Sequence, residues 1–266
     1  MYDTFLFDTL HHQQATMAPH FFNGQKVWLK KAGKRNSRFS YLPLTLLARW
    51  LGIDALKPVP NLGGPLSIAK EAARIKTLFL AGVPVPTILA ESPEALLIAD
   101  ATISEGQPFQ TLQEKLVAAQ RTEEINYYLE MSIHALNDVH ARQCYLSEAF
   151  TRNILVNRKG VTFIDFETDP GEYHQLTTCM VRDWYCFIFS LYGKLSKRQP
   201  HLDLLAPALI SGLKQAPPEV QDNFLVTLQR LKSLERFPFH RFGSDGKKIA
   251  VTLHALSLLD QQLRIH

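Results

Sequence analysis

The chain has 266 residues, 46% of them hydrophobic and 20% charged, and a formal net charge of +4. These values fit a globular protein and exclude a collagen-like, low-complexity or highly charged disordered chain. The longest apolar run, WYCFIFSLY at 184–192, is about half as long as a membrane-spanning helix requires. Acids near the N-terminus argue against a signal peptide, so a cytoplasmic protein is expected.

The first predicted element is a β-hairpin within residues 18–30. Asn23 and Gly24 separate two strand-like runs, and an Asn-Gly pair in this position is a strong signal for a two-residue turn. An inserted helix and loop are predicted over 40–66, with the loop in the sequence KPVPNLGGP at 57–65.

Basic residues are concentrated in residues 20–57, which contain eight Lys or Arg residues and one acid, Asp54. Such a strip suits nucleic acid, anionic lipid or a phosphorylated substrate, and it is also compatible with a solvated face. Aromatic residues are not interleaved with basic ones as they are in nucleic-acid-binding surfaces, so no nucleic-acid partner is expected.

A helix is predicted over residues 67–80, with Ser67 as its N-cap and Gly82 just beyond its end. Its apolar face has helical spacing and consists of Ile68, Ala72, Ile75 and Phe79. The sequence VPVPTILAESPEALLIAD at 83–100 then predicts two short strands around a turn.

The remainder of the chain is predicted to be mainly helical, after a connector at 100–106. Long helices are expected at 122–142 and 177–194, and further helices separated by Pro or Gly follow residue 200. The sequence therefore predicts an α+β protein with a small β-rich part at 1–102 and a larger helical part at 103–266.

The three cysteines, Cys144, Cys179 and Cys186, lie in this helical part. They form no CxxC pair and have no zinc-like spacing to histidine. Reduced thiols are expected, and no zinc site.

One β-hairpin, TRNILVNRKGVTFIDFE at 151–167, interrupts the helical part. If RKG forms a three-residue loop, Asn157 faces Val161 and Asn153 faces Asp165 at the open end of the hairpin. An amide oxygen and a carboxylate at a rigid edge suit a hard cation such as Mg²⁺. The alternative is that Asn153 caps a turn and Asp165 begins a loop.

The segment VHARQCYLSEAFTRNILVNRKGVTFIDFE at 139–167 resembles the protein-kinase-like superfamily, in its lipopolysaccharide-kinase-like and small-molecule phosphotransferase branch. His140 matches a His at the end of the long helix in that branch. Leu146, Ser147 and Glu148 occupy the places of a His-Gly-Asp triplet. The resemblance implies a bilobal fold and an ATP- and Mg²⁺-dependent kinase.

The same resemblance implies roles for individual residues. Lys30, in the strand VWLK, holds the ATP phosphates and pairs with Glu71. Asn153 and Asp165 hold Mg²⁺, and Glu148 accepts or orients the proton of the attacking hydroxyl. Asp183 resembles a buried acid that braces the catalytic loop.

Several alternatives remain for these positions. Lys31 is the alternative inward-facing lysine, and Glu71 is alternatively a solvated helix residue. His140 is expected to be a packed structural histidine. Glu167 is either a ligand of a second metal ion or a solvated acid.

The sequence departs from the family pattern at the catalytic carboxyl, where Glu148 adds one methylene to the expected Asp. No GxGxxG precedes Lys30, so FFNGQK at 21–26 or PNLGGP at 60–65 is expected to cover the phosphates. The segment 168–179 is short and lacks an Ala-Pro-Glu motif, which favours a sugar, glycolipid or other small hydroxyl acceptor.

Two hypotheses follow from these departures. The first is an active kinase, with residues 20–57 in peripheral contact with the anionic inner face of the membrane. The second is a catalytically impaired pseudokinase that acts as a nucleotide-binding or protein-interaction module.

Overall fold

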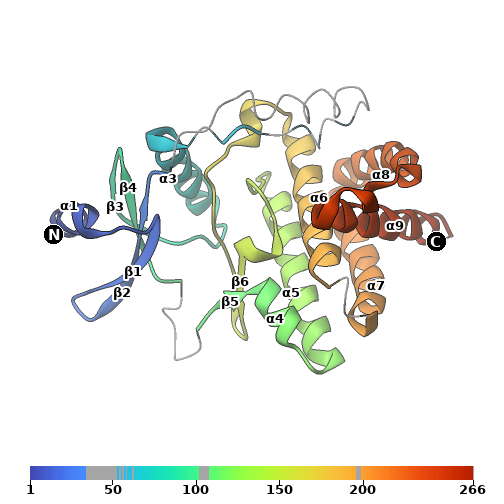
Figure 1. Ribbon diagram of the computed structural model, residues 1–266, viewed down its shortest axis with the longest axis horizontal. Helices are drawn as coiled ribbons and strands as arrows, with labels where there is room; N and C mark the ends of the chain where they lie inside the picture. Colours follow the sequence, from blue (N-terminus) through green and yellow to red (C-terminus); the bar gives the residue numbers. More distant parts are fainter. Residues whose placement is uncertain are drawn as a thin grey trace.

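The computed structural model shows an α+β protein in which an antiparallel sheet is followed by a mostly helical remainder (Figure 1). The structure describes residues 1–33, 53, 55, 57, 59–61, 63–101, 108–195 and 199–265. Most of the predicted inserted segment at 40–66 and most of the predicted connector at 100–106 lie outside these residues. Every helix within the described ranges is too short or too polar to span a membrane.

Four described strands form the first sheet, in the order β1-β2-β4-β3. Their bounds are Met17–Phe22 for β1, Gln25–Lys31 for β2, Ile88–Ser92 for β3 and Ala95–Ala99 for β4. Asn23 and Gly24 connect β1 to β2 with φ angles of 50° and 76°. Asn and Gly tolerate this left-handed conformation, which the tight turn requires, and the predicted hairpin is confirmed.

The helix α1, Tyr2–His12, covers one face of this sheet and was not predicted. Its buried residues Leu6 and Leu10 pack with Val27 and Leu29 of β2 in a separate small core. Because side chains alternate along a strand, the residues that follow Val27 and Leu29 in β2 face away from α1. This alternation directs Trp28 and Lys30 toward the rest of the molecule.

The helix α3, Gly64–Leu80, begins three residues earlier than predicted. Gly63 is the N-cap, and Pro65 lies in the first turn, where proline's missing N–H is tolerated. The prediction that Ser67 is the N-cap is therefore wrong. Its hydroxyl lies inside the helix and donates to the Gly64 carbonyl oxygen at 2.8 Å.

The buried face of α3 agrees with the prediction at three of four positions. The buried members are Ile68, Ala72 and Ile75. Phe79 is 58% exposed, because the neighbouring Leu78 takes the core position at this end of the helix. Gly82 has a φ of 74° just past the helix, as its predicted role requires.

The helical remainder contains the predicted long helices. The described helices are α4 (Leu112–Ala118), α5 (Thr122–Ala141), α6 (Leu176–Leu195), α7 (Gln199–Gln215), α8 (Pro218–Lys232) and α9 (Gly243–Ile265). One hydrophobic core runs from the inner face of the first sheet through α3 and α5 to α8, with Trp184 and Phe187 of α6 fully buried. Helices α7, α8 and α9 lie on the side away from the first sheet (Figure 1).

A second described sheet, in the order β5-β6-β7, contains the hairpin of the helical part. Its strands are Gln110–Thr111, Ile154–Asn157 and Gly160–Phe163. The predicted register is wrong by one residue, because Asn157 pairs with Gly160 rather than with Val161. The Asn157 Oδ1 accepts from the backbone N–H groups of Lys159 and Gly160 at 2.7 and 3.0 Å, which closes the turn over two residues instead of three.

Candidate active site

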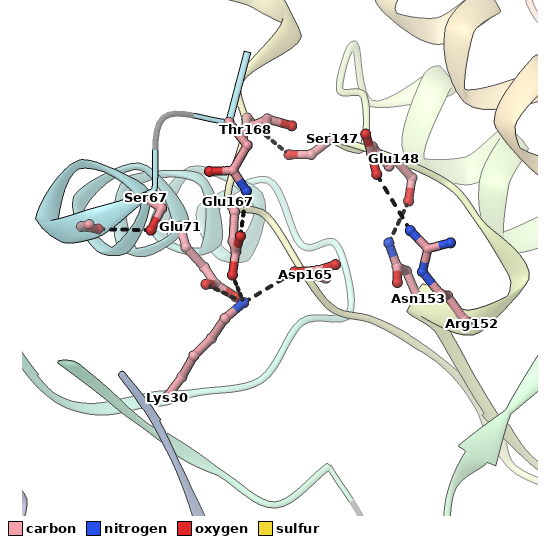
Figure 2. A network of polar contacts seen from close by, with 12 residues as sticks. Lys30, Ser67, Glu71, Ser147, Glu148, Arg152, Asn153, Asp165, Glu167 and Thr168 are labelled. Atoms are coloured by element: carbon pink, nitrogen blue, oxygen red, sulfur yellow. Dashed lines mark hydrogen bonds and ion pairs between the residues drawn. The ribbon is translucent and has the colours of Figure 1, made fainter. Parts of the chain in front are cut away.

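The site centres on the ammonium group of Lys30, which contacts three carboxylates (Figure 2). The Lys30 Nζ lies 2.7 Å from Glu71 Oε2, 3.1 Å from Asp165 Oδ1 and 2.9 Å from Glu167 Oε1. These carboxylates come from α3 and from the chain that follows β7. One cation therefore joins three segments that are far apart in sequence.

The pleat of β2 explains why Lys30, and not Lys31, points into the site. Lys31 lies on the opposite face of the strand, where its Nζ donates to the carbonyl oxygens of Leu10 and Gln13 at 3.2 and 2.7 Å. Lys31 therefore fixes the C-terminal end of α1. The alternative assignment of Lys31 as the inward lysine is wrong.

Burial and charge act in opposite directions on Lys30 and Glu71, whose side chains are 13% and 3% exposed. Burial lowers the pKa of Lys30, but the carboxylates of Glu71, Asp165 and Glu167 outweigh it and hold that pKa above its usual value. Burial raises the pKa of the Glu71 carboxyl, and Lys30 opposes this rise. Glu71 is a buried ion-pair partner, so the alternative of a solvated residue is wrong.

Asp165 lies just beyond β7 in a strained backbone conformation, with a φ of 72°. A non-glycine residue in this region costs about 1 kcal/mol or more, and such residues cluster at functional sites. The shifted register places Ile164 opposite Asn153, since the Ile164 N–H donates to the Asn153 carbonyl oxygen at 3.0 Å. Asp165 is thus one residue past the position predicted for it.

Asn153 ends the short 3-10 helix η3, Thr151–Asn153, and is 5% exposed. Its amide nitrogen donates to the Glu148 carbonyl oxygen at 3.1 Å, so the amide oxygen is the atom with ligand chemistry. Figure 2 shows Asn153 and Glu148 on the side of Asp165 away from Glu71.

Glu148 lies between two arginines. Its Oε1 is 3.8 Å from the Arg182 guanidinium, and its Oε2 is 3.8 Å from the Arg152 guanidinium. Burial raises the pKa of the Glu148 carboxyl, and Arg182 and Arg152 oppose the rise. The carboxyl is therefore partly buried, at 30% exposed, and lies close to two permanent positive charges.

Asp183 of α6 fixes the segment before Glu148. Its Oδ2 accepts from the Leu146 backbone N–H at 2.7 Å and lies 3.2 Å from His140 Nε2. Asp183 and His140 are both fully buried. His140 therefore has the packed structural position expected for it, and it has no exposure to solvent.

The chain that precedes α3 reaches across the site and contacts the helical part. Asn61 Nδ2 donates to Glu167 Oε2 at 2.6 Å. Burial raises the pKa of Glu167, but Lys30 and Asn61 outweigh it and the pKa is lowered.

The Arg182 guanidinium donates to the carbonyl oxygens of Ala55 and Lys57 at 3.1 and 3.0 Å. We call this pair of hydrogen bonds the Arg182 tether.

A pocket of about 610 Å³ lies beside these groups. Its polar lining includes Lys30, Glu71, Asn153, Asp165 and Glu167. Its apolar lining includes Trp28, Ile98, Phe109, Leu155 and Ile164. The volume is in the range of small-molecule and cofactor pockets, and the mixed lining suits a ligand with one apolar and one polar end.

The pocket brings together four of the five predicted site residues, Glu148 being the exception. Sequence reasoning missed Trp28, which lines the pocket and donates from Nε1 to Asp100 Oδ1 at 3.2 Å. The two-residue period of β2 was sufficient to place Trp28 on the same face as Lys30. Sequence reasoning also missed Arg182, because no pattern in the sequence marks this residue as part of the site.

Four of the eight basic residues of the 20–57 segment, Lys34, Arg35, Arg38 and Arg49, lie outside the described residues. Lys26, Lys30 and Lys31, which are described, all contact carboxylates or backbone carbonyl groups. The expected phosphate cover by the glycines of PNLGGP is not tested. Gly63 and Gly64 both have a φ of 63° at the start of α3.

Among the described residues, no group of three or more His, Cys, Asp or Glu side chains is arranged to hold a metal ion. No protein-family model and no curated protein matches the chain. Its function is therefore inferred from the geometry of the site.

Proposed function

We propose that this protein is an ATP- and Mg²⁺-dependent phosphotransferase with a bilobal, protein-kinase-like arrangement, in which residues 1–102 form the small lobe and 103–266 the large one. The observation that carries the proposal is the Lys30 ammonium, which joins Glu71 of α3 to Asp165 after β7 at the edge of a 610 Å³ pocket. A buried ion pair positions Lys30 at the polar end of the pocket, where phosphate groups would lie.

Asn153 and Asp165 fit a magnesium ion. Both line the pocket, one offers an amide oxygen and the other a carboxylate that is 39% exposed. Mg²⁺ prefers one or two such protein oxygens and takes the remaining ligands from water and phosphate. When bound, the ion supplies neutralisation of the phosphate charge. The described carboxylates outnumber the nearby lysine, so nucleotide binding without a divalent cation is expected to be weak.

Glu148 is the residue that orients or deprotonates the acceptor hydroxyl. Asp183 holds the backbone at Leu146, and the Asn153 amide holds the Glu148 carbonyl, so the segment that carries Glu148 is fixed at both ends. Fixed positioning and charge neutralisation are the main requirements of phosphoryl transfer. The acceptor class is a sugar, glycolipid or other small molecule with a free hydroxyl group.

A second candidate function is that of a pseudokinase. The observation that favours it is the position of Glu148 between Arg152 and Arg182. The Glu148 carboxylate already has these two arginines of the protein itself as ion-pair partners. In that case the pocket binds nucleotide and no phosphate is transferred.

Thermal unfolding with and without Mg-ATP tests nucleotide binding. Ligand at about one hundred times its Kd adds about 2.7 kcal/mol, which raises Tm by about 5 °C or more. Asp165→Asn removes the charge but keeps a side chain that tolerates a positive φ, and it is expected to abolish the shift. Glu91→Gln is the matched control, because Glu91 pairs with Lys76 on the surface and does not line this pocket. An undiminished shift in Asp165→Asn contradicts the proposal.

Turnover distinguishes the two candidate functions. An active kinase transfers the γ-phosphate to an acceptor hydroxyl or to water, and Glu148→Gln lowers the rate at least about a hundredfold while keeping the Mg-ATP shift. A pseudokinase shows the shift and no measurable transfer. Absence of both the shift and the transfer refutes the two candidates together.

A further inference from the structure

The turn between α8 and α9 exposes aromatic side chains, and none of them lines the pocket. Phe237 and Phe242 are 51% and 62% exposed, and their rings stack with centroids 5.8 Å apart. Phe239 lies between them in sequence, is partly buried and packs against the core. Adjacent exposed aromatic rings of this kind indicate an interaction surface.

Backbone hydrogen bonds hold this turn in one shape. The 3-10 helices η5 (Ser233–Arg236) and η6 (Phe239–Arg241) form its two halves. The N–H groups of Phe237 and Phe242 donate to the carbonyl oxygens of Leu234 and Phe239 at 3.0 and 2.9 Å. The aromatic rings are therefore presented by a preformed backbone, which reduces the entropy lost on binding.

Cationic residues flank the two rings in sequence. Residues 233–247 contain three Lys or Arg residues, Arg236, Arg241 and Lys247, and two acids, Glu235 and Asp245. Arg236, Arg241 and Lys247 are exposed. The Glu235 carboxylate lies 3.0 Å from His254 Nδ1, which directs it toward α9. The exposed part of the turn thus combines apolar rings with cations.

We infer that residues 233–247, which we call the aromatic-basic turn, dock on the surface of an anionic lipid bilayer. Exposed phenylalanines that directly follow exposed arginines, Phe237 after Arg236 and Phe242 after Arg241, match the interface of such a bilayer, where rings enter the acyl boundary and cations contact the headgroups. Single-stranded nucleic acid requires rings open for stacking on bases, whereas Phe237 and Phe242 stack on each other.

Phe7 provides an internal comparison. It is exposed to the same extent as Phe242, at 62%, but it lies in α1 between Asp3 and Asp8. An exposed ring among acids is repelled from an anionic surface. If charge and aromatic exposure are both required, Phe7 contributes nothing to membrane binding.

Co-sedimentation of the full chain with vesicles tests the inference. Binding is expected to vesicles of phosphatidylglycerol and phosphatidylethanolamine, to be absent with phosphatidylcholine alone, and to weaken with salt. Arg236→Gln with Arg241→Gln is expected to weaken binding about thirtyfold. Phe237→Ser with Phe242→Ser is expected to weaken it at least about tenfold. Phe7→Ser is the matched control and leaves binding unchanged.

Each alternative has a distinct outcome. Vesicle binding that neither paired substitution weakens places the contact elsewhere, for example in residues 20–57, and overturns the inference. Binding of a single-stranded oligonucleotide that depends on Phe237 and Phe242, without vesicle binding, also overturns it. Thermal unfolding of each variant without lipid establishes that the substitutions leave the fold intact. The vesicle assay contains no nucleotide, so its result is independent of the proposed kinase activity.

Discussion

Replacing Lys30 by methionine tests the charge balance of the site. Methionine keeps an unbranched apolar side chain and removes the ammonium that Glu71, Asp165 and Glu167 share. The carboxylates of Asp165 and Glu167 are 39% and 32% exposed and retain much of their hydration. Glu71, at 3% exposed, loses its cation inside the protein.

The loss of stability is limited by the ability of Glu71 to take up a proton. Burial already raises the pKa of Glu71 and Lys30 opposes that rise, so the substitution raises the pKa further. Neutralising a carboxyl of ordinary pKa costs about 3.7 kcal/mol at pH 7 and almost nothing below about pH 4. A carboxyl with a raised folded-state pKa stabilises the protein below its unfolded pKa, and this contribution is lost as pH rises through the folded pKa.

The Lys30→Met variant is therefore expected to lose about 2 to 4 kcal/mol of unfolding free energy near pH 7 and less than about 1 kcal/mol near pH 4.5. Urea denaturation of the variant and the parent protein at the two pH values measures both quantities. Adding Glu71→Leu to Lys30→Met removes the orphaned carboxyl and is expected to recover most of the loss near pH 7. Equal losses at both pH values, or no recovery in the double variant, would refute the reasoning.

Two further predictions concern the segment before the hairpin. Burial raises the pKa of the Glu148 carboxyl. The stability that this carboxyl contributes is present below its unfolded pKa and is lost as pH rises through its folded pKa. Glu148→Gln is therefore expected to raise the unfolding free energy by up to about 1 kcal/mol near pH 7 and to leave it unchanged below about pH 4. Urea denaturation measures this gain, and a loss at pH 7 contradicts it. Asp183→Ala leaves the Leu146 N–H and His140 without their acceptor and is expected to cost about 3 kcal/mol. Asp183→Asn keeps an acceptor oxygen and is expected to cost about half as much, so equal losses would show that the hydrogen bond to Leu146 is unimportant.

Features that depend on a few adjacent residues were predictable from the sequence. The turn at Asn23 and Gly24 and the helix end at Gly82 each require a positive φ, and the sequence supplies a residue that tolerates it. The amphipathic period located the long helices. The same kind of reasoning failed at Ser67. A hydroxyl residue is a common N-cap, but Pro65 was the better signal and marked a helix start three residues earlier.

The register of the second hairpin failed for a different reason. Its prediction counted residues in the loop, whereas the turn is closed by the Asn157 side chain, which bonds two backbone N–H groups. A shift of one residue moves every opposed pair. Asn153 and Asp165 nevertheless line the same pocket, because Asp165 leaves the strand with a left-handed backbone that was not foreseeable from the sequence.

Contacts between distant segments were the least predictable part of the site. The hairpin pattern suggested Asn153 and Asp165 as neighbours, whereas Lys30 and Glu71 were added only by the expected resemblance to a kinase family, because composition and periodicity alone could not link them to the hairpin. Asn61 contacts Glu167 across 106 residues of sequence, and no local pattern marks either as a partner. Such pairs depend on the folded positions of all the elements between them.

The Arg182 tether has a consequence for the order of folding. Its two hydrogen bonds close loops of 127 and 125 residues, and those loops contain α3, the strands β3 and β4 of the first sheet, α5 and the second hairpin. Contacts that close long loops form late, because the entropy of the intervening chain is lost before they contribute. Arg182 donates to backbone carbonyl oxygens and not to side chains. We expect the tether to be among the last native contacts to form, and Arg182→Lys to speed unfolding far more than it slows folding.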